Sequence, residues 1–172
     1  MRKEAAVIPD QIVEYLEKRN VPYERRSHRR ALTAQEVAAC MHVTGYRVAK
    51  SVIVEAGGRT WIAVLPAAEV VDEEQLAALI GGPVRLVGEQ EFTSLFPGCE
   101  AGAEPPFGGL YGLPVVVDST LASADRVVFR AGSHEEALEL RYRDFADLER
   151  GAMVGTFGRI PVHAPKGNAS LR

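Results

Sequence analysis

The spacing of apolar positions predicts short strands and helices that alternate along the chain, with no internal repeat. Two β-rich runs, residues 48–55 and 60–65, flank Gly57-Gly58. This arrangement predicts a β-hairpin, because glycine readily adopts the positive φ angles of a tight turn. Residues 137–142 alternate as a strand does, although the same pattern is compatible with a helix. Further strands are predicted at residues 84–87, 113–117 and 126–130.

Helix start and stop signals lie between these strands. Pro9-Asp10 begins a predicted helix that ends near Asn20, and Thr33 with Glu36 forms a capping box that begins another. A third helix begins at Asp72, and shorter helices are predicted at residues 89–96 and 144–150. The connections are too short and irregular for a doubly wound parallel sheet. The pattern therefore predicts a mixed α/β (α+β) domain with a hairpin-rich, largely antiparallel sheet.

Composition places the chain among ordinary globular proteins. Its 172 residues are 47% hydrophobic and 25% charged, which is enough for one domain with a substantial core. No apolar run approaches the roughly 18 residues of a membrane span. The apolar stretch near the N-terminus is too short for a signal peptide, and Cys40 and Cys99 do not form a disulfide framework. We therefore expect a cytoplasmic protein with no membrane contact.

The net charge of −3 is unevenly distributed along the chain. Residues 1–50 carry 10 basic and 6 acidic side chains, giving +4, whereas residues 51–150 carry 7 basic and 17 acidic ones, giving −10. Residues 25–30 form a compact basic run. Such a run can neutralise phosphates, or it can be a solvated surface loop. The acidic middle block argues against strong general affinity for RNA.

The most unusual local composition lies at residues 102–112, which are rich in glycine and proline. This loop runs into the apolar strand that ends at Asp118. Because glycine allows close approach of a ligand and proline stiffens the backbone, the loop can present backbone groups to a small molecule. A tight connection between two strands explains the same composition.

Lys50 is the second position that needs an explanation. By the two-residue period of a strand, it shares one face with Val48, Val52 and Val54. Burying an ammonium among valines without a partner is costly. Lys50 therefore either reaches a cleft, where it meets a phosphate or carboxylate, or extends to solvent at the edge of the sheet.

Four segments of the chain together resemble the YbaK-type domains, also called prolyl-tRNA-synthetase-associated editing domains. In order, they are Thr33-Ala-Gln-Glu36-Val-Ala; Val48-Ala-Lys50-Ser-Val-Ile-Val; Gly102-Ala-Glu-Pro-Pro106-Phe-Gly; and Leu113-Pro-Val-Val-Val-Asp118 followed by Val128-Phe-Arg-Ala-Gly132-Ser. The signature of that family is one lysine early in a strand and a G-x-x-x-P loop, which correspond here to Lys50 and to Gly102–Pro106. We assign residues 1–150 to a single editing-like domain and residues 151–172 to a C-terminal extension that is partly flexible.

The resemblance implies a mostly antiparallel sheet curled into a partial barrel, with helices around it. It also implies a hydrolase that acts in trans on the ester joining a wrong amino acid to tRNA, most often proline tRNA carrying Cys or Ala. In the family the lysine is thought to anchor the terminal adenosine or its phosphate, a role that falls to Lys50. The loop with Gly102, Pro106, Phe107 and Gly108 is expected to line the aminoacyl pocket. A ribose hydroxyl or the thiol of the substrate assists, and no side-chain nucleophile is invoked.

The side chains present are compatible with that chemistry. No G-x-S-x-G motif occurs, Cys40 is expected to pack within a helix, and Cys99 has no paired base. We therefore expect metal-independent hydrolysis without a cofactor, in which N–H groups of Phe107-Gly108-Gly109 stabilise the oxyanion. Metal-ligand spacing is absent from the histidines, which are His28, His42, His134 and His163.

Other polar residues are weaker candidates for the site. Asp118 either orients the adenosine or the loop, or caps the turn that follows it. Ser133 and His134 lie where a turn can face the pocket and contact substrate. The expected phosphate contacts, whose removal should weaken tRNA binding without changing amino-acid choice, are Arg29, Arg30 and Arg47.

Three functions are compatible with the sequence. The leading one is an editing deacylase whose partners are the 3′ aminoacyl end of tRNA and, in delivery, prolyl-tRNA synthetase, with no DNA contact. The second is a module that binds the tRNA end without turnover. The third is a domain for small-molecule or protein binding that reuses the pocket. Lys50 and the intact Gly102–Pro106 loop favour the first.

Overall fold

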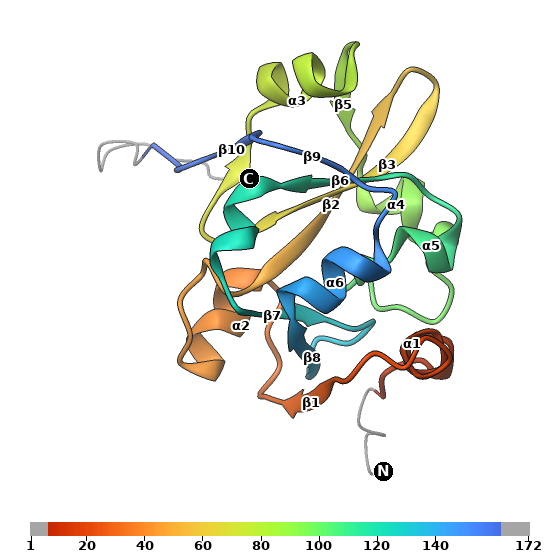
Figure 1. Ribbon diagram of the computed structural model, residues 1–172, viewed down its shortest axis with the longest axis vertical. Helices are drawn as coiled ribbons and strands as arrows, with labels where there is room; N and C mark the ends of the chain where they lie inside the picture. The colour runs from red at the N-terminus through yellow and green to blue at the C-terminus, as the bar shows by residue number, and fades with distance from the viewer. Residues whose placement is uncertain (1–6, 163–172) are drawn as a thin grey trace.

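The chain folds into three sheets with helices packed around them in the computed structural model, which describes residues 7–162 (Figure 1). The helical segments are α1 (Asp10–Glu17), α2 (Ala34–Met41), α3 (Glu73–Ile80), α4 (Glu89–Phe92), η1 (Thr93–Leu95), α5 (Gly108–Tyr111), η2 (Ser119–Ser123) and α6 (Tyr142–Leu148). The strands are β1 (Glu24–Ser27), β2 (Ala49–Ala56), β3 (Arg59–Pro66), β4 (Val70–Val71), β5 (Val84–Leu86), β6 (Val115–Asp118), β7 (Arg126–Arg130), β8 (Glu136–Arg141), β9 (Met153–Gly155) and β10 (Gly158–Arg159).

The main sheet has the strand order β5-β2-β3-β6-β9. Its centre is the predicted hairpin of β2 and β3, whose turn residues Gly57 and Gly58 have φ angles of 59° and 73°. β5 pairs antiparallel with β2, whereas β6 pairs parallel with β3 and β9 pairs parallel with β6. The sheet is therefore mixed rather than wholly antiparallel.

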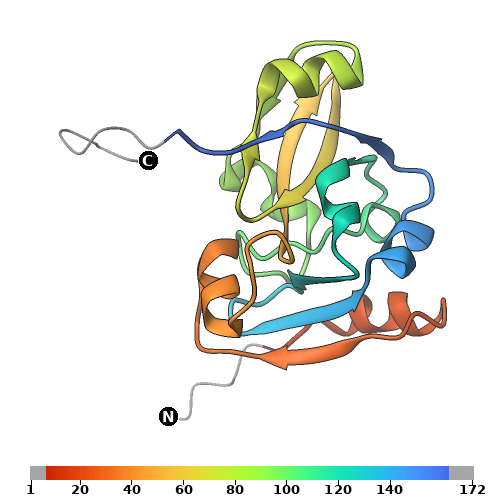
Figure 2. The same ribbon diagram turned by 60° about the vertical axis from the view of Figure 1, so that its left-hand side comes forward.

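A second, antiparallel sheet has the order β1-β8-β7 and lies below the main sheet in Figure 2. Residues 136–141 form a strand of this sheet, which decides between the strand and the helix that the sequence allowed. A bridge between Val48 and Val128 joins the two sheets just before β2 begins. Antiparallel strand pairs predominate, and none of the three sheets closes into a barrel. The predicted mixed α/β class is therefore confirmed.

The capping box predicted for α2 is present. Thr33 accepts a hydrogen bond from the backbone N–H of Glu36, and the Glu36 carboxylate accepts one from the N–H of Thr33. The buried side of α2 packs on small apolar residues of the two sheets, including Val48 and Ala137. None of the helices within residues 7–162 has the length and apolar character needed to span a membrane.

The segment after residue 150 belongs to the same domain. β9 is a strand of the main sheet, and β10 pairs with β4. Between them, Phe157 is completely buried against Val54, Leu76 and other apolar residues. The predicted C-terminal extension therefore packs on the domain over residues 153–159, although the sequence of this short segment gives no periodic signal. The rest of the predicted flexible tail, residues 163–172, lies outside the described residues.

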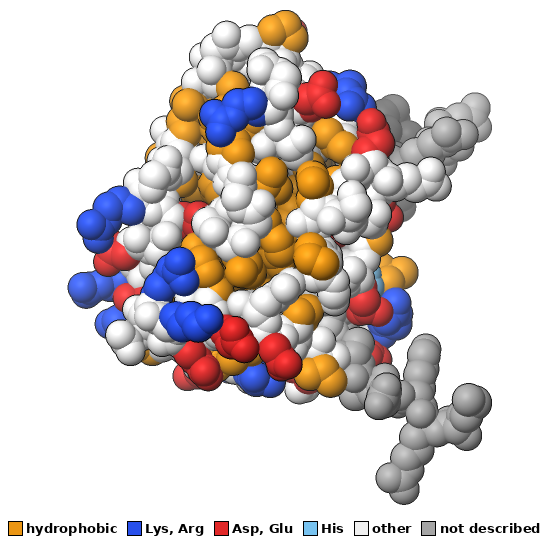
Figure 3. All heavy atoms as spheres, turned by 90° about the vertical axis from the view of Figure 1, so that its right-hand side faces the viewer, with side chains coloured by type: hydrophobic (Ala, Val, Ile, Leu, Met, Phe, Trp, Pro, Cys, Tyr) orange, Lys and Arg blue, Asp and Glu red, His pale blue; other side chains and the backbone are white. Residues whose placement is uncertain are grey.

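Figure 3 shows the face of the molecule that carries α1, α4 and α5. Hydrophobic side chains gather in the middle of this face, and charged side chains lie around its margin. A surface of this kind is poorly suited to a phosphate backbone, which needs clustered basic groups.

Candidate functional site

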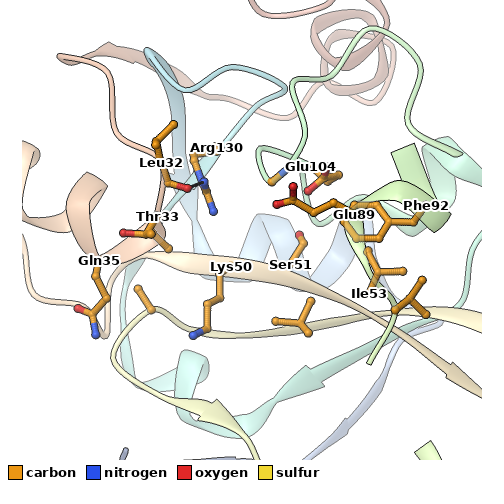
Figure 4. Close-up of a pocket in the computed structure, with 15 residues that line it drawn as sticks. Leu32, Thr33, Gln35, Lys50, Ser51, Ile53, Glu89, Phe92, Glu104 and Arg130 are labelled. Atoms are coloured by element: carbon orange, nitrogen blue, oxygen red, sulfur yellow. Dashed lines mark hydrogen bonds between the residues drawn. The ribbon is translucent and has the colours of Figure 1, made fainter. Parts of the chain in front are cut away.

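A cavity of about 290 Å³ lies beside the first half of β2 and brings Lys50 and Gly102 to one site (Figure 4). Its walls come from β2, from the segment that leads into α2, from α4 and from the loop after residue 101. Ile53, Val87 and Phe92 supply apolar surface. The other polar side chains of the lining are Thr33, Gln35, Ser51, Glu89, Glu104 and Arg130.

Lys50 lies where β2 has a neighbour on one side only, because β5 pairs with residues 54–56 and not with the start of the strand. Its side chain is half-buried and leaves β2 on the side opposite Ser51 (Figure 4). Burial lowers the pKa of Lys50 and the Arg130 guanidinium lowers it further, whereas the Glu69 carboxylate opposes both. Both alternatives for Lys50 thus hold in part, since the sheet edge and the cleft coincide here.

Two carboxylates, those of Glu104 and Glu89, lie next to Gly102. Its backbone N–H donates to Glu104 Oε1 at 2.8 Å, and its φ of +86° is strained for any residue with a side chain. A Cβ atom at this position would lie 3.2 Å from Glu89 Oε1. The glycine of the G-x-x-x-P loop is therefore needed both for its conformation and for the space that Glu89 occupies.

Pro106, Phe107 and Gly108 lie behind the cavity and do not line it. Phe107 is completely buried, with its ring 5.5 Å from that of Tyr15 and 5.0 Å from that of Phe129. A Cβ atom on Gly108 would clash with Val115 and with the carbonyl oxygen of Leu113. This half of the loop builds the core, so the expectation that Phe107 and Gly108 bind substrate gains no support from their position.

The N–H groups of Gly108 and Gly109 lie near a buried carboxylate, that of Glu149, and favour its charged form. This carboxylate accepts a hydrogen bond from the Tyr15 hydroxyl at 3.2 Å. Neither glycine lines the cavity, so the prediction that the N–H groups of residues 107–109 stabilise an oxyanion gains no support from the geometry. Glu149 lies about 40 positions further along the chain than these glycines, and no pattern in the local sequence indicates the contact.

Ser133 and His134 are buried and do not line the cavity. The His134 ring nitrogens lie 3.1 Å from the carbonyl oxygen of Ala31 and 2.9 Å from that of Ala101. Its backbone N–H donates to Glu100 Oε2 at 2.6 Å. Contrary to the expectation of substrate contact, His134 ties together the two loops that border the cavity, while the Ser133 hydroxyl accepts from the N–H of Glu135.

Asp118 is fully buried and caps the turn that follows it, which is the structural alternative that the sequence allowed. Its carboxylate accepts from the N–H groups of Thr120, Phe157 and Gly158 at 2.7–2.9 Å. Burial alone would raise the pKa of Asp118, but these hydrogen bonds together hold it below the usual value. The residue joins the end of β6 to the segment between β9 and β10.

The three predicted phosphate contacts lie in two places. Arg29 donates to Cys40 Sγ, Arg30 pairs with Glu100 at 3.1 Å, and both line a second surface hollow that shares Leu32 with the cavity. Arg47 lies apart from them and donates to the buried Glu139 carboxylate at 3.2 Å. Arg29 and Arg30 are therefore next to the cavity, whereas Arg47 is not.

Sequence reasoning missed Ser51, Glu89, Glu104 and Arg130. Glu104 lies inside the G-x-x-x-P loop itself, and Ser51 follows the signature lysine. Arg130 shares a face of β7 with Val128 by the two-residue period, so an argument like that applied to Lys50 could have found it. Glu89 reaches the cavity only through the fold, and no local signal marks it.

Cys99 does not have the surroundings of a nucleophile. Cys99 Sγ lies 3.5 Å from the Tyr111 hydroxyl, and burial raises the pKa of its thiol. Among residues 7–162, no three His, Cys, Asp or Glu side chains are grouped so that they could hold a metal ion. His163 lies outside the described residues.

Comparison with known proteins places this cavity in a family. The aminoacyl-tRNA editing domain family matches residues 28–148, which is most of the chain and includes every residue of the cavity lining. The chain belongs to this family. The editing-domain resemblance of the sequence is thereby confirmed. Among curated proteins, no significant match is found.

Solved structures of similar fold support the same placement. One, hypothetical protein APE2540, has a TM-score of 0.77 and 25% identity, and the match covers 87% of this chain and 99% of that one. A candidate trans-editing enzyme for prolyl tRNA synthetase has a TM-score of 0.75 and 21% identity, with coverage of 87% and 96%. At that identity the second comparison establishes a shared editing-domain fold.

Proposed function

We propose that the protein is a trans-editing hydrolase that removes a wrongly attached amino acid from tRNA. One observation carries the proposal: in a chain of the aminoacyl-tRNA editing family, Lys50 and Gly102 line a single cavity. A cavity of about 290 Å³ is at the small end of ligand pockets, so it suits an aminoacyl group with the terminal adenosine at its mouth.

The tRNA end is held by positive charge near the cavity. Lys50 anchors the terminal adenosine or its phosphate, and Arg29 and Arg30 contact phosphates further along the acceptor end. Arg47 contributes at most to the more distant tRNA body. Prolyl-tRNA synthetase is the natural donor of the mischarged tRNA, and the substrate we propose is proline tRNA carrying alanine or cysteine, in the cytoplasm.

Hydrolysis in this site depends on positioning rather than on a nucleophilic side chain. The described lining of the cavity contains neither Cys nor His, and the Ser51 hydroxyl has no hydrogen-bond partner among the described residues. We therefore propose a metal-independent reaction in which a ribose hydroxyl or the substrate thiol assists the attack. Gly102 and the loop towards Pro106 hold the acyl group in place.

The test is deacylation of alanyl- and cysteinyl-tRNA for proline by the wild type and by Lys50→Ala. The matched control is Lys18→Ala, because Lys18 is an exposed lysine directly after α1 whose ion pair among the described residues is with Glu14. We expect hydrolysis by the wild type and the control, and a loss of about 100-fold or more in Lys50→Ala. Tight tRNA binding without hydrolysis of any mischarged tRNA would instead identify a non-catalytic module.

A further inference from the structure

The polar groups of the cavity are arranged with opposite charges on opposite sides (Figure 4). Arg130 reaches in from one side, beside Leu32. The carboxylates of Glu89 and Glu104 lie together on the other side. Ser51 points into the space between them, and its hydroxyl oxygen is buried without a hydrogen-bond partner among the described residues.

Arg130 has most of its hydrogen-bonding capacity unused. One nitrogen, Nη1, donates to the carbonyl oxygen of Leu32 at 2.7 Å, and no carboxylate of residues 7–162 pairs with the guanidinium within 4.0 Å. A guanidinium carries five N–H donors in a planar fork. Burial lowers the pKa of Arg130, and the charges of Glu104, Glu36 and Glu89 oppose this. A half-buried cation with unused donors is stabilised by an oxygen acceptor in the cavity.

Glu104 is only 6% exposed, which is unusual for a carboxylate without an ion pair. The backbone N–H of Gly102 donates to its carboxylate at 2.8 Å, and burial raises its pKa. The Glu89 carboxylate lies over Gly102, close to the same loop. Two carboxylates held in this way repel each other, and a cation between them and Ser51 would relieve the repulsion.

We propose that this cavity recognises the unblocked α-amino group of an aminoacyl ester, with Glu104 and Glu89 accepting from the α-ammonium and Arg130 donating to the ester carbonyl oxygen. The inference deepens the proposed function and rests on it. It defines the substrate class as aminoacyl-tRNA with a free amine, and it excludes peptidyl-tRNA and N-acylated aminoacyl-tRNA. An N-acyl group removes the positive charge and brings a carbonyl oxygen against two carboxylates.

The same arrangement also stabilises the negative charge of the transition state, without the N–H groups of Gly108 and Gly109. Water attacks the carbonyl carbon, the bond from this carbon to the ribose oxygen breaks, and the ribose oxygen takes up the proton that the water loses. The negative charge that develops on the carbonyl oxygen lies against the Arg130 guanidinium. Ser51 is placed to donate its hydroxyl to the same oxygen or to accept from the ammonium.

The test compares alanyl-tRNA with N-acetyl-alanyl-tRNA for proline, using the wild type, Glu104→Gln and Arg130→Gln. We expect N-acetylation to reduce kcat/KM of the wild type at least about 10-fold, and to matter much less in Glu104→Gln. Arg130→Gln should lower kcat at least about 10-fold with KM little changed. Glu91→Gln and Arg141→Gln, which alter exposed charges outside the cavity, should behave as wild type. Equal hydrolysis of both substrates would overturn the inference while the editing function stands.

A binding measurement distinguishes failure of this inference from failure of the proposed editing function. Calorimetry uses 3′-alanylamido-3′-deoxyadenosine, which cannot be hydrolysed as an ester, and its N-acetyl form. Preferential binding of the free amine by the wild type, lost in Glu104→Gln and in Glu89→Gln, supports the inference even where no tRNA is deacylated. Equal binding of the two analogues overturns it, as does the absence of any binding. Glu104→Gln keeps the acceptor for the Gly102 N–H, and thermal melting verifies that each variant is folded.

Discussion

A buried carboxyl group makes the stability of this domain sensitive to pH. Glu149 is only 9% exposed and accepts a hydrogen bond from the Tyr15 hydroxyl, and the backbone N–H groups of Gly108 and Gly109 also favour its charged form. Burial raises the pKa of Glu149 to about 7 from its ordinary 4.5, although these hydrogen bonds oppose the shift. Between pH 4.5 and about 7, the folded protein therefore keeps a proton that the unfolded chain has lost.

The size of the effect follows from this difference. A raised pKa of an acid means that its contribution to stability is complete below the unfolded value and is lost as pH rises through the folded value. Each pH unit in the window removes about 1.4 kcal/mol, so the 2.5 units between 4.5 and 7 amount to about 3 kcal/mol. A glutamine at this position has no proton to lose and should remove this part of the pH dependence.

The measurement is urea unfolding of the wild type, Glu149→Gln and Asp147→Asn at about pH 4, 5, 6, 7 and 8, values that bracket the window. Asp147 is an exposed acid of the same helix and serves as the control. The free energy of unfolding of the wild type should fall relative to that of Glu149→Gln as pH rises, by about 3 kcal/mol in total. A difference that is constant across pH, or that grows in favour of the wild type, would refute the reasoning.

Three further predictions concern the fold and the site. Phe157→Ala should destabilise the domain by about 3 kcal/mol or more, because the Phe157 side chain fills the core. Urea unfolding measures this loss, and a change below about 1 kcal/mol would place residues 153–159 outside the domain. Gly102→Ala should reduce deacylation far more than Gly57→Ala, which imposes similar backbone strain in open space; equal kinetics in the two variants would contradict a role for the Gly102 loop. Arg30→Ala should weaken tRNA binding and reduce the slope of log Kd against log salt concentration by about 1. A salt titration tests this, with Arg141→Ala as the control variant, and an unchanged slope would show that Arg30 does not contact tRNA phosphates.

Local signals in the sequence predicted much of the fold. The Gly57-Gly58 hairpin and the capping box of Thr33 depend on residues close together in the chain, so their patterns are sufficient. The position of Lys50 on one face of β2 follows from strand periodicity alone. The short segment of β9 and β10 was missed because two- and three-residue strands leave no periodic pattern.

The candidate site shows where such reasoning stops. The composition of a loop rich in glycine and proline does not show which distant groups pack against it, and here the buried Glu149 carboxylate lies near Gly108 and Gly109. Likewise, two of the three N–H groups that donate to the Asp118 carboxylate, those of Phe157 and Gly158, lie about 40 residues further along the chain. Arg130 and Glu89 meet Gly102 only because β7 and α4 are brought to β2 by tertiary contacts. Long-range contacts of this kind are decided by the fold as a whole.

We propose that the cavity lined by Lys50 and Gly102 edits mischarged tRNA. The decisive measurement is the ratio of kcat/KM for alanyl-tRNA to that for prolyl-tRNA, both on proline tRNA, in the wild type and in Lys50→Ala. We predict that the wild type hydrolyses the alanyl ester and spares the prolyl ester, and that Lys50→Ala hydrolyses neither. Equal hydrolysis of both esters, or full activity in Lys50→Ala, would contradict the account.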